Sequence, residues 1–366
     1  MRIAIDEQIF VVQEFGGISR LFSELAEQFY RNPNLGVELQ SLSTPVINHY
    51  LLDDEGLSTQ LNVTEADNHY EAMLRYFLRP ARKGEVDLVH NTYYLPRGFR
   101  DYGAAPRVMT IHDMIPEIFP ETRRRLDMLT LKHRYFTRAD HVICVSEATR
   151  RDLERIYGAT DTPITVVHHG VDQLFQRVDT RVAGMPQDYI LFVGHRSAYK
   201  DAETLVKAYA KLISHETGPH LLFVGGGAFT RQELATFRSL GITERVHQFS
   251  LTESEMPSAY SAARMLVFPS RYEGFGLPAL EGMACGTPVL LADSSALPEV
   301  GGDAAVYFPP RNADSLASLM LQVLRDDAMR ENLVSRGLER TTQWTWTRSA
   351  EATARVYERT IEATRK

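Results

Sequence analysis

The chain has 366 residues, 44% of them hydrophobic and 24% charged, which is typical of a folded globular protein long enough for two domains. The 40 basic and 47 acidic side chains give a formal net charge of −7, which argues against nucleic acid as the principal partner. The two cysteines, Cys144 and Cys285, lie in apolar stretches, so neither a disulfide framework nor a Cys-based zinc site is predicted. We expect a reducing, cytoplasmic compartment.

Short apolar strands alternate with amphipathic stretches through the first half of the chain. Strands are predicted at residues 2–5, 86–90, 107–111, 141–145 and 164–167. This alternation is typical of an α/β fold with a parallel sheet. Asp6 and Glu7 directly follow the first strand, so no secretory signal is expected. No apolar run reaches the length of about 18 residues that a membrane-spanning helix needs.

The alternation restarts after a polar segment at residues 179–187. Further strands are predicted at residues 189–194, 220–224, 246–249, 265–269 and 288–291. We therefore expect two doubly wound lobes, residues 1–182 and 183–345. In the last segment, Trp346, Ala350, Ala354 and Tyr357 recur every three or four residues, which predicts a helix with one apolar face.

The segment from Phe268 to Val289 carries the most informative motif. Its residues Gly274, Phe275, Gly276 and Leu277 join a predicted strand to a predicted helix. Such a loop directs backbone N–H groups and a helix dipole at one point, which suits phosphate or sugar hydroxyls. Glu273 precedes the helix and Glu281 lies within it, so the two carboxylates can border one pocket. In the alternative interpretation, Glu273 caps a turn and Glu281 is a solvated residue near the helix start.

This segment resembles the E-x7-E signature of the retaining glycosyltransferases of family 4, which have the GT-B fold. The resemblance implies that Glu273 faces the donor sugar, that the amides from Gly274 to Leu277 face its hydroxyls and phosphate, and that Glu281 faces the nucleotide ribose. It also implies two Rossmann-like lobes, with the acceptor at residues 1–182 and the nucleotide sugar at residues 183–345. Helix 346–366 is then expected to cross back and pack on the first lobe.

Other segments resemble the same family along nearly the whole chain. Residues 15–20 are similar to its first glycine-rich loop, so Gly16, Gly17 and Arg20 are candidate substrate-binding residues. Residues 167–172 are similar to its end-of-domain strand and turn. By the same resemblance Ser250 and Leu251, just after the strand that ends at Phe249, are candidate nucleobase contacts.

His112 and Asp113 resemble the family's HD pair. The resemblance makes His112 a candidate catalytic residue that contacts the donor sugar near the acceptor, with Asp113 a candidate substrate contact. The alternative is a polar turn in which Asp113 caps a short helix.

Gly194, Arg196 and Lys200 follow the first strand of the second lobe. Arg grips phosphate through a planar fork, whereas Lys supplies a point charge. By resemblance, Arg196 and Lys200 hold the donor diphosphate and Gly194 belongs to the same binding loop. Taken alone, each cation would be better interpreted as part of a solvated turn, because most charged residues are exposed.

The sequence lacks any Asp-x-Asp, and its twelve histidines show no metal-ligand spacing. We therefore expect neither a metal nor another cofactor. Basic residues gather in the first lobe among apolar side chains, which suggests contact with anionic lipid or a lipid diphosphate; the alternative is solvated helix faces. These residues are Arg75, Arg79, Arg82, Lys83, Arg123, Arg124, Arg125, Lys132, Arg134 and Arg138.

The sequence thus predicts a cytoplasmic, retaining, metal-independent hexosyltransferase whose site lies in the cleft between the lobes. Mannose from GDP-mannose is the preferred donor, and the acceptor is a hydroxyl of a bacterial surface polysaccharide or a lipid-linked glycan, with peripheral contact at the inner membrane. UDP-glucose and UDP-N-acetylglucosamine are alternative donors. A non-catalytic sugar-nucleotide-binding subunit is an alternative of another class. A nucleotide-cofactor oxidoreductase is disfavoured because no G-x-G-x-x-G follows the first strand.

Overall fold

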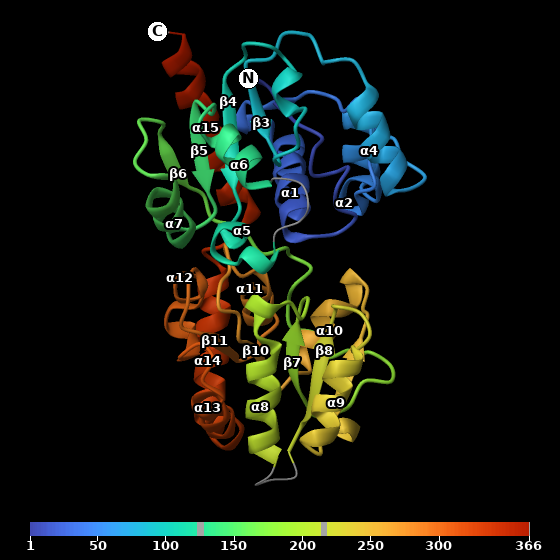
Figure 1. Cartoon of the computed structure of the whole chain (residues 1–366), viewed down its shortest axis with the longest axis vertical. Helices are drawn as coiled ribbons and strands as arrows, with labels where there is room; N and C mark the ends of the chain where they lie inside the picture. The colour runs from blue at the N-terminus through green and yellow to red at the C-terminus, as the bar shows by residue number, and fades with distance from the viewer. Residues whose placement is uncertain (123–127, 214–217, 366) are drawn as a thin grey trace. The chain divides into compact units, whose positions relative to one another are not determined.

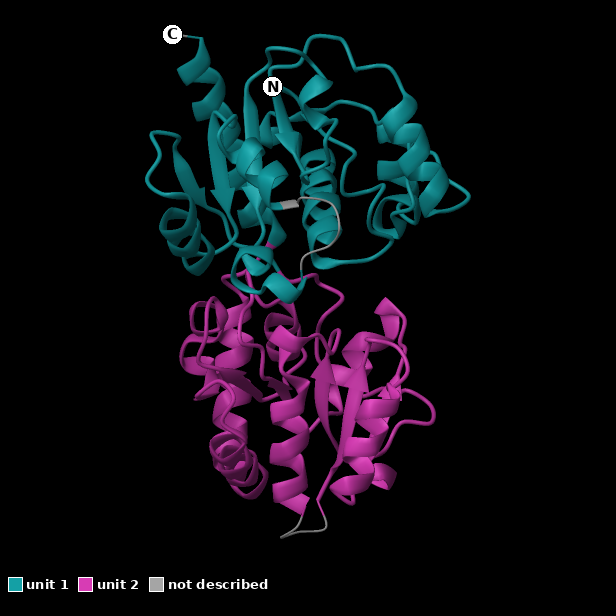
Figure 2. Cartoon of the chain, viewed as in Figure 1, with its two compact units in different colours: residues 1–170, 346–366 teal, residues 171–345 magenta. Residues whose placement is uncertain are grey.

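The computed structural model describes residues 1–122, 128–213 and 218–365, and it divides the chain into two compact units. Unit 1 comprises residues 1–170 and 346–366, and unit 2 comprises residues 171–345 (Figure 2). The first boundary lies before the predicted one at 182/183 because the intervening segment packs on unit 2. There, Phe175 contacts the ring of Tyr260, and the Val178 amide donates to the Ser261 hydroxyl at 3.1 Å.

Unit 1 is built on a six-stranded parallel sheet with the order β2-β1-β3-β4-β5-β6 (Figure 1). The strands are β1 (Arg2–Ile5), β2 (Glu38–Leu39), β3 (Leu88–Asn91), β4 (Arg107–Ile111), β5 (His141–Cys144) and β6 (Ile164–Val166). Its helices are α1 (Gly17–Arg31), α2 (His49–Leu52), α3 (Glu55–Leu61), α4 (His69–Leu78), α5 (Ile115–Ile118), α6 (Met128–Phe136), α7 (Glu147–Tyr157) and α15 (Trp346–Thr364). Every residue of β3, β4 and β5 is buried, as expected for central strands covered on both faces.

Unit 2 contains a second six-stranded parallel sheet, with the order β12-β11-β10-β7-β8-β9. Its strands are β7 (Tyr189–Val193), β8 (His220–Val224), β9 (Val246–Phe249), β10 (Met265–Phe268), β11 (Val289–Ala292) and β12 (Ala305–Phe308). The helices are α8 (Ala202–Ile213), α9 (Arg231–Ser239), α10 (Met256–Ser261), α11 (Leu277–Ala284), α12 (Leu297–Gly301), α13 (Ala313–Arg325) and α14 (Asp327–Thr341). The predicted strands of both lobes are thus confirmed to within about two residues.

The sheet order determines which loops meet in unit 2. Strand β7 lies between β10 and β8, and β9 flanks β8. In parallel sheets all strands end at one edge, and ligands bind beyond the carboxyl ends where the strand order reverses. The loops after β7, β8, β9 and β10 are therefore neighbours at one edge, although they are distant in the sequence.

The last helix, α15, belongs to unit 1, which confirms the predicted return of the chain to the first lobe. Its predicted apolar face is buried, and the helix packs against α1. The Tyr357 hydroxyl lies 2.7 Å from Nδ1 of His90, whose Nε2 lies 2.8 Å from the Thr110 hydroxyl. Burial lowers the pKa of His90 to about 3, so its ring is neutral at physiological pH.

No helix in the described part of the chain combines the length and the apolar character needed to cross a membrane.

The Tyr357–His90 contact generates a stability prediction. Tyr357→Phe leaves His90 Nδ1 buried without its partner, so we expect the free energy of unfolding to fall by about 1–2 kcal/mol in urea titrations. Tyr70→Phe is the matched control, because Tyr70 is 75% exposed, and it should change stability by less than about 0.5 kcal/mol. Equal effects of the two variants would contradict a stabilising role for this contact.

Candidate functional site

Two of the predicted catalytic residues meet at the carboxyl edge of the second sheet. Lys200 follows β7, Glu273 follows β10, and Lys200 Nζ donates to Glu273 Oε1 at 2.7 Å. The side chains are only 14% and 10% exposed. They meet because β7 and β10 are adjacent, so loops 73 residues apart in sequence leave the sheet side by side.

The loop that carries Glu273 is hydrogen-bonded to the loop that follows β11. The Glu273 amide donates to the Ser295 hydroxyl at 2.7 Å. Gly276 has φ of 120°, and a Cβ there would lie 2.9 Å from Leu297 Cδ2, so the turn into α11 requires glycine. Helix α11 then begins at Leu277 without a side-chain cap, with Pro278 in its first turn. An N-terminus of this kind favours an anion or hydroxyl ligand.

Glu281 lies further along α11 and is buried. Its Oε2 accepts a hydrogen bond of 2.7 Å from the Tyr260 hydroxyl on α10. Both carboxylates of the motif therefore lie on one loop–helix segment and each has a defined partner, so the solvated alternative for Glu281 is wrong. Their predicted contacts with sugar and ribose stay predictions.

The other predicted contacts lie at the same edge of the sheet. Gly194 directly follows β7 and has φ of 125°, a conformation that favours glycine. Ser250 and Leu251 directly follow β9, and the Ser250 hydroxyl accepts from Gln248 Nε2 at 3.3 Å. The predicted nucleobase role of Ser250 and Leu251 stays a prediction.

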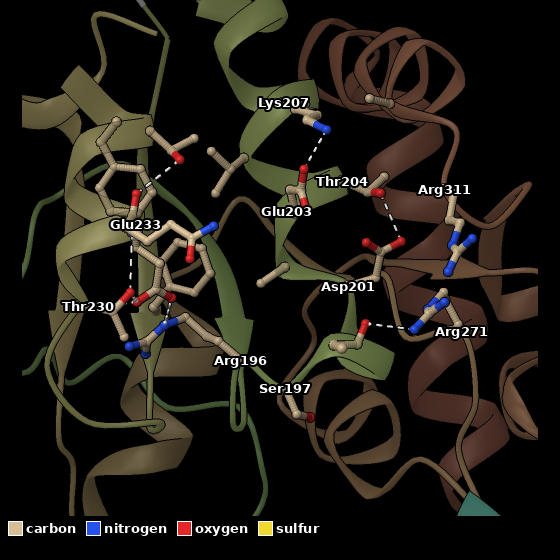
Figure 3. Close-up of a pocket in the computed structure, with 18 residues that line it drawn as sticks. Arg196, Ser197, Asp201, Glu203, Thr204, Lys207, Thr230, Glu233, Arg271 and Arg311 are labelled. Carbon is tan, nitrogen blue, oxygen red and sulfur yellow. Dashed lines mark hydrogen bonds and ion pairs between the residues drawn. The ribbon is translucent and has the colours of Figure 1, made fainter. Parts of the chain in front are cut away.

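Arg196 has partners other than those of Lys200. Its Nε donates to Glu233 Oε1 at 2.6 Å (Figure 3). Its Nη1 donates to the Gly225 carbonyl at 3.2 Å, and Nη2 donates to the carbonyls of Gly227 and Ala228 at 3.0 Å each. The guanidinium therefore holds the glycine loop after β8. The diphosphate roles of Lys200 and Arg196 both stay predictions.

The glycine loop, residues 225–227, leaves room for the Arg196 guanidinium because its residues have no side chains. Gly225, Gly226 and Gly227 all have φ between 70° and 87°, a run that only glycine adopts without strain. A Cβ on Gly226 would lie 2.7 Å from Arg196 Nη1. Sequence reasoning did not predict the partner Glu233. Thr230 and Glu233 form a capping box, and the spacing of these two residues was the signal available in the sequence.

At the corresponding edge of unit 1, the predicted glycine loop begins α1. Gly16 precedes the helix, which has neither a side-chain cap from Gly16 nor an acidic residue in its first turn, and Gly17 is its first residue. The Ser19 amide donates to Gln13 Oε1 at 3.2 Å. Arg20 is buried, and its guanidinium lies 5.1 Å from the centre of the Tyr50 ring.

His112 directly follows β4, and one of its two ring nitrogens makes a hydrogen bond. Its Nε2 lies 3.1 Å from the Thr92 carbonyl, so Nε2 is assigned the proton and Nδ1 is an acceptor. Burial lowers the pKa of His112 to about 3, which keeps the ring neutral. Nδ1 is buried and has no hydrogen-bond partner in the described part of the chain. It can therefore accept a hydrogen bond from a substrate hydroxyl.

Asp113 has the local role of the alternative interpretation. Its Oδ1 accepts from the Ile115 amide at 2.9 Å, at the start of α5. Any direct substrate contact of Asp113 stays a prediction.

Sequence reasoning missed a buried polar network beneath His112. Asp6, directly after β1, accepts from the Asn91 amide group at 2.6 Å and from the Thr92 hydroxyl and amide at 2.6 and 3.0 Å. Burial raises the pKa of Asp6. Since the Thr92 carbonyl in turn contacts His112, this network fixes the backbone that orients the ring. A carboxylate directly after a buried strand was the signal available in the sequence.

The predicted basic surface of the first lobe is wrong for Arg79, Arg82 and Lys132, whereas Arg75 and Lys83 are exposed. Arg79 and Arg82 are mostly buried in ion pairs with Glu7, and Arg79 also pairs with Asp101 at 2.6 Å. Lys132 is buried and pairs with Glu117 at 3.0 Å. Residues 123–125 lie outside the described part of the chain. Arg134 and Arg138 are exposed and lie over the Phe99 ring.

Among the described residues, no group of three or more His, Cys, Asp or Glu side chains is placed to hold a metal ion.

Comparison with known proteins identifies the class. Residues 15–173 match the pattern of "Glycosyltransferase Family 4", and residues 179–340 match that of "Glycosyl transferases group 1". The chain is 29% identical over 281 residues to "O-antigen chain mannosyltransferase B" of Escherichia coli, covering 72% of this chain and 73% of that protein. It is 31% identical to "D-inositol 3-phosphate glycosyltransferase" of Nocardiopsis dassonvillei, covering 74% and 70%.

Among solved structures, sucrose-phosphate synthase of Thermosynechococcus elongatus superposes with a TM-score of 0.73 at 21% identity over 99% of both chains. Fold and site together define a glycosyltransferase with the GT-B fold. The chain belongs to glycosyltransferase family 4.

The clamp between Arg196 and the glycine loop generates a second prediction. Gly226→Ala should lower the free energy of unfolding by about 1–2 kcal/mol, because the new Cβ meets a guanidinium fixed by four hydrogen bonds and φ at this position is 73°. Gly218→Ala is the control, since its Cβ would have no neighbour nearer than 3.9 Å. Urea unfolding of both variants tests this, and an unaffected Gly226→Ala would contradict the clamp.

Proposed function

We propose that the chain is a retaining, metal-independent hexosyltransferase that moves mannose from GDP-mannose to a hydroxyl of a growing bacterial polysaccharide or lipid-linked glycan. The observation that carries this proposal is the Lys200–Glu273 pair beside the uncapped start of α11. It places a cation, a carboxylate and directed amides at one edge of one sheet. The name of the Escherichia coli mannosyltransferase favours mannose and a polysaccharide acceptor.

The charge that develops during transfer explains the need for these groups. Breaking the bond between the anomeric carbon and the leaving phosphate oxygen places extra negative charge on the diphosphate. In this proposal Lys200 and the first amides of α11 stabilise that charge, and Glu273 accepts hydrogen bonds from sugar hydroxyls. The departing phosphate accepts the proton of the acceptor hydroxyl. In unit 1, the neutral Nδ1 of His112 accepts a further substrate hydroxyl.

The role proposed for Lys200 gives a kinetic prediction. Preorganised charge-stabilising donors each contribute a factor on the order of 10²–10³ to kcat, so Lys200→Ala should lower kcat by at least about 100-fold. Lys211→Ala on α8 is the control, because Lys211 is half exposed and pairs with Asp314. Steady-state kinetics with varied donor provides the measurement. Wild-type kcat with only a raised donor KM would contradict the charge-stabilising role.

The donor class is tested directly by binding. Thermal shifts should be measured with GDP-mannose, UDP-glucose, UDP-N-acetylglucosamine, dTDP-glucose and ADP-glucose. A donor present at 100 times its Kd adds about 2.7 kcal/mol of stability, which is readily detected. We expect GDP-mannose to give the largest increase in melting temperature. A larger increase with a UDP-sugar would identify that sugar as the donor instead.

Transfer assays complete this test. Full turnover in excess EDTA and an α-configured product from an α-linked donor are expected, the latter by NMR of the product. A strict requirement for Mg²⁺ or Mn²⁺ would overturn metal independence. The inositol phosphate glycosyltransferase relative makes a phosphorylated cyclitol a second acceptor class for the panel. Binding of a donor without transfer to any acceptor would favour the non-catalytic alternative.

We further propose that α4 mediates peripheral contact with an anionic membrane surface. Tyr70, Leu74, Phe77 and Leu78 form an exposed apolar stripe on this helix, with Tyr70 75% and Leu78 74% exposed. Arg75, on the same helix, is also exposed and pairs with Glu71. An apolar helical stripe with a cation beside it is the pattern of interfacial helices.

Leu78→Glu should reduce flotation with liposomes that contain anionic lipid by at least about five-fold at low salt, because a carboxylate replaces an apolar contact and repels the surface. Leu338→Glu on α14 is the control, since Leu338 is also exposed. Absence of wild-type flotation, or an equal loss in the control, would contradict membrane contact through α4.

A further inference from the structure

Unit 2 contains a cavity of about 620 Å³ that does not include the Lys200–Glu273 pair among its lining residues. It is lined by parts of α8 and α9, by the start of α13 and by the loops after β7 and β10 (Figure 3). Pockets of 300–1,000 Å³ are of a size that binds small molecules. The residues at its two ends differ in charge, and this difference indicates a ligand class.

At one end of the cavity the charges are paired. Arg196 pairs with Glu233 at 2.6 Å at that end, and Lys207 pairs with Glu203 at 2.5 Å on α8, between the two ends (Figure 3). Glu233 also accepts a hydrogen bond from the Thr230 hydroxyl at 2.8 Å. Carboxylates and hydroxyls of this kind are suited to bind the hydroxyl groups of a sugar.

At the other end, two guanidinium groups gather around one carboxylate. The side chains of Arg271, Arg311 and Asp201 lie together there (Figure 3). Arg271 donates to the Ala198 carbonyl at 3.1 Å, and Arg311 lines the cavity near Asp201. Burial raises the pKa of Asp201, whereas nearby Arg311 lowers it. Two guanidiniums with a single acid suit a phosphate monoester, which accepts their planar donor pairs.

The cavity wall also includes an unpartnered hydroxyl and apolar side chains. Ser197 Oγ is buried and has no hydrogen-bond partner among the described residues. Val206, Phe223 and Phe237 supply apolar wall. A buried hydroxyl left without a partner costs free energy unless a ligand or water satisfies it. The cavity therefore fits a small ligand that has hydroxyls, an apolar ring face and one phosphate.

The cavity shares its walls with the proposed donor site. The Arg271 amide donates to the Tyr199 carbonyl at 2.7 Å, and the Lys200 amide donates to the Ser197 carbonyl at 2.9 Å. Arg271 and Ser197 face the cavity, whereas Lys200 contacts Glu273, two residues after Arg271. A ligand that moves Arg271 or Ser197 would thus move the backbone that carries Lys200.

We propose that this cavity is a regulatory site for a phosphorylated monosaccharide, whose phosphate binds Arg271 and Arg311 and whose binding changes the position of Lys200. The lining residues of this site include Arg196 but not Lys200, Glu273 or Glu281. Its regulatory effect rests on the proposed transferase function, but its ligand binding does not.

Isothermal titration calorimetry on the full chain tests binding, with mannose 6-phosphate, inorganic phosphate and mannose as probes. We expect mannose 6-phosphate to bind more tightly than the other two. Arg311→Gln should weaken its binding about ten-fold or more, whereas Arg238→Gln, an exposed position on α9 outside the cavity, should not. Equal affinity in wild type and Arg311→Gln would overturn the site, and equal affinity for phosphate and mannose 6-phosphate would overturn the sugar as part of the ligand.

A donor-site variant distinguishes the two sites. Glu281→Gln should leave the affinity for mannose 6-phosphate unchanged. If this variant no longer bound mannose 6-phosphate, the ligand would be placed in the donor site and the proposal would be overturned. In transfer assays, saturating mannose 6-phosphate should change the donor KM or kcat at least three-fold in wild type and Arg238→Gln but not in Arg311→Gln. Binding without such a change would overturn regulation. Absence of all transfer would count against the proposed function and leave the calorimetric result standing.

Discussion

The contact between Lys200 and Glu273 is the interaction on which the candidate donor site depends. Two charges that are 10–14% exposed have lost much of their hydration, and such a pair is maintained only when its geometry is good. That geometry comes from the adjacent carboxyl ends of β7 and β10 and from the hydrogen bond between Glu273 and Ser295. In the proposed function, a diphosphate that approaches Lys200 must compete with Glu273 for the ammonium group. Donor binding and the release of Glu273 toward sugar hydroxyls are then parts of one exchange of partners.

The strands and the catalytic motif could be predicted because their signals are local. A buried parallel strand is a short apolar run, as in β10, and Gly276 with Pro278 marks the turn into α11 regardless of what lies around them. The return of α15 to unit 1 agrees with its apolar stripe. The unit boundary was placed too late, since the segment after Gly170 has loop composition but packs on α10 through contacts such as Phe175 with Tyr260.

The directions and partners of charged side chains could not be predicted, since they depend on long-range contacts. Arg196 and Lys200 are four residues apart in one loop, yet Lys200 meets Glu273 and Arg196 meets Glu233, 37 residues further along the chain. Likewise, Arg79 looks like a surface cation in sequence but pairs with Glu7, 72 residues before it. Sequence pattern alone cannot distinguish a basic helix face in water from one that ends in a buried carboxylate.

The candidate contacts of the two carboxyl edges include different kinds of group, and this difference indicates which chemistry each can perform. In unit 1, burial keeps the His112 ring neutral, so this predicted contact is a hydrogen-bonding group without a charge. In unit 2, Lys200 and Glu273 form a charged pair beside a helix N-terminus. Neutral acceptors such as His112 Nδ1 can distinguish hydroxyl groups without attracting counterions, whereas a fixed cation is needed where phosphate charge develops. In the proposed function, sugar hydroxyls and the diphosphate need different kinds of contact, and in each unit the candidate group lies at the end of a buried strand.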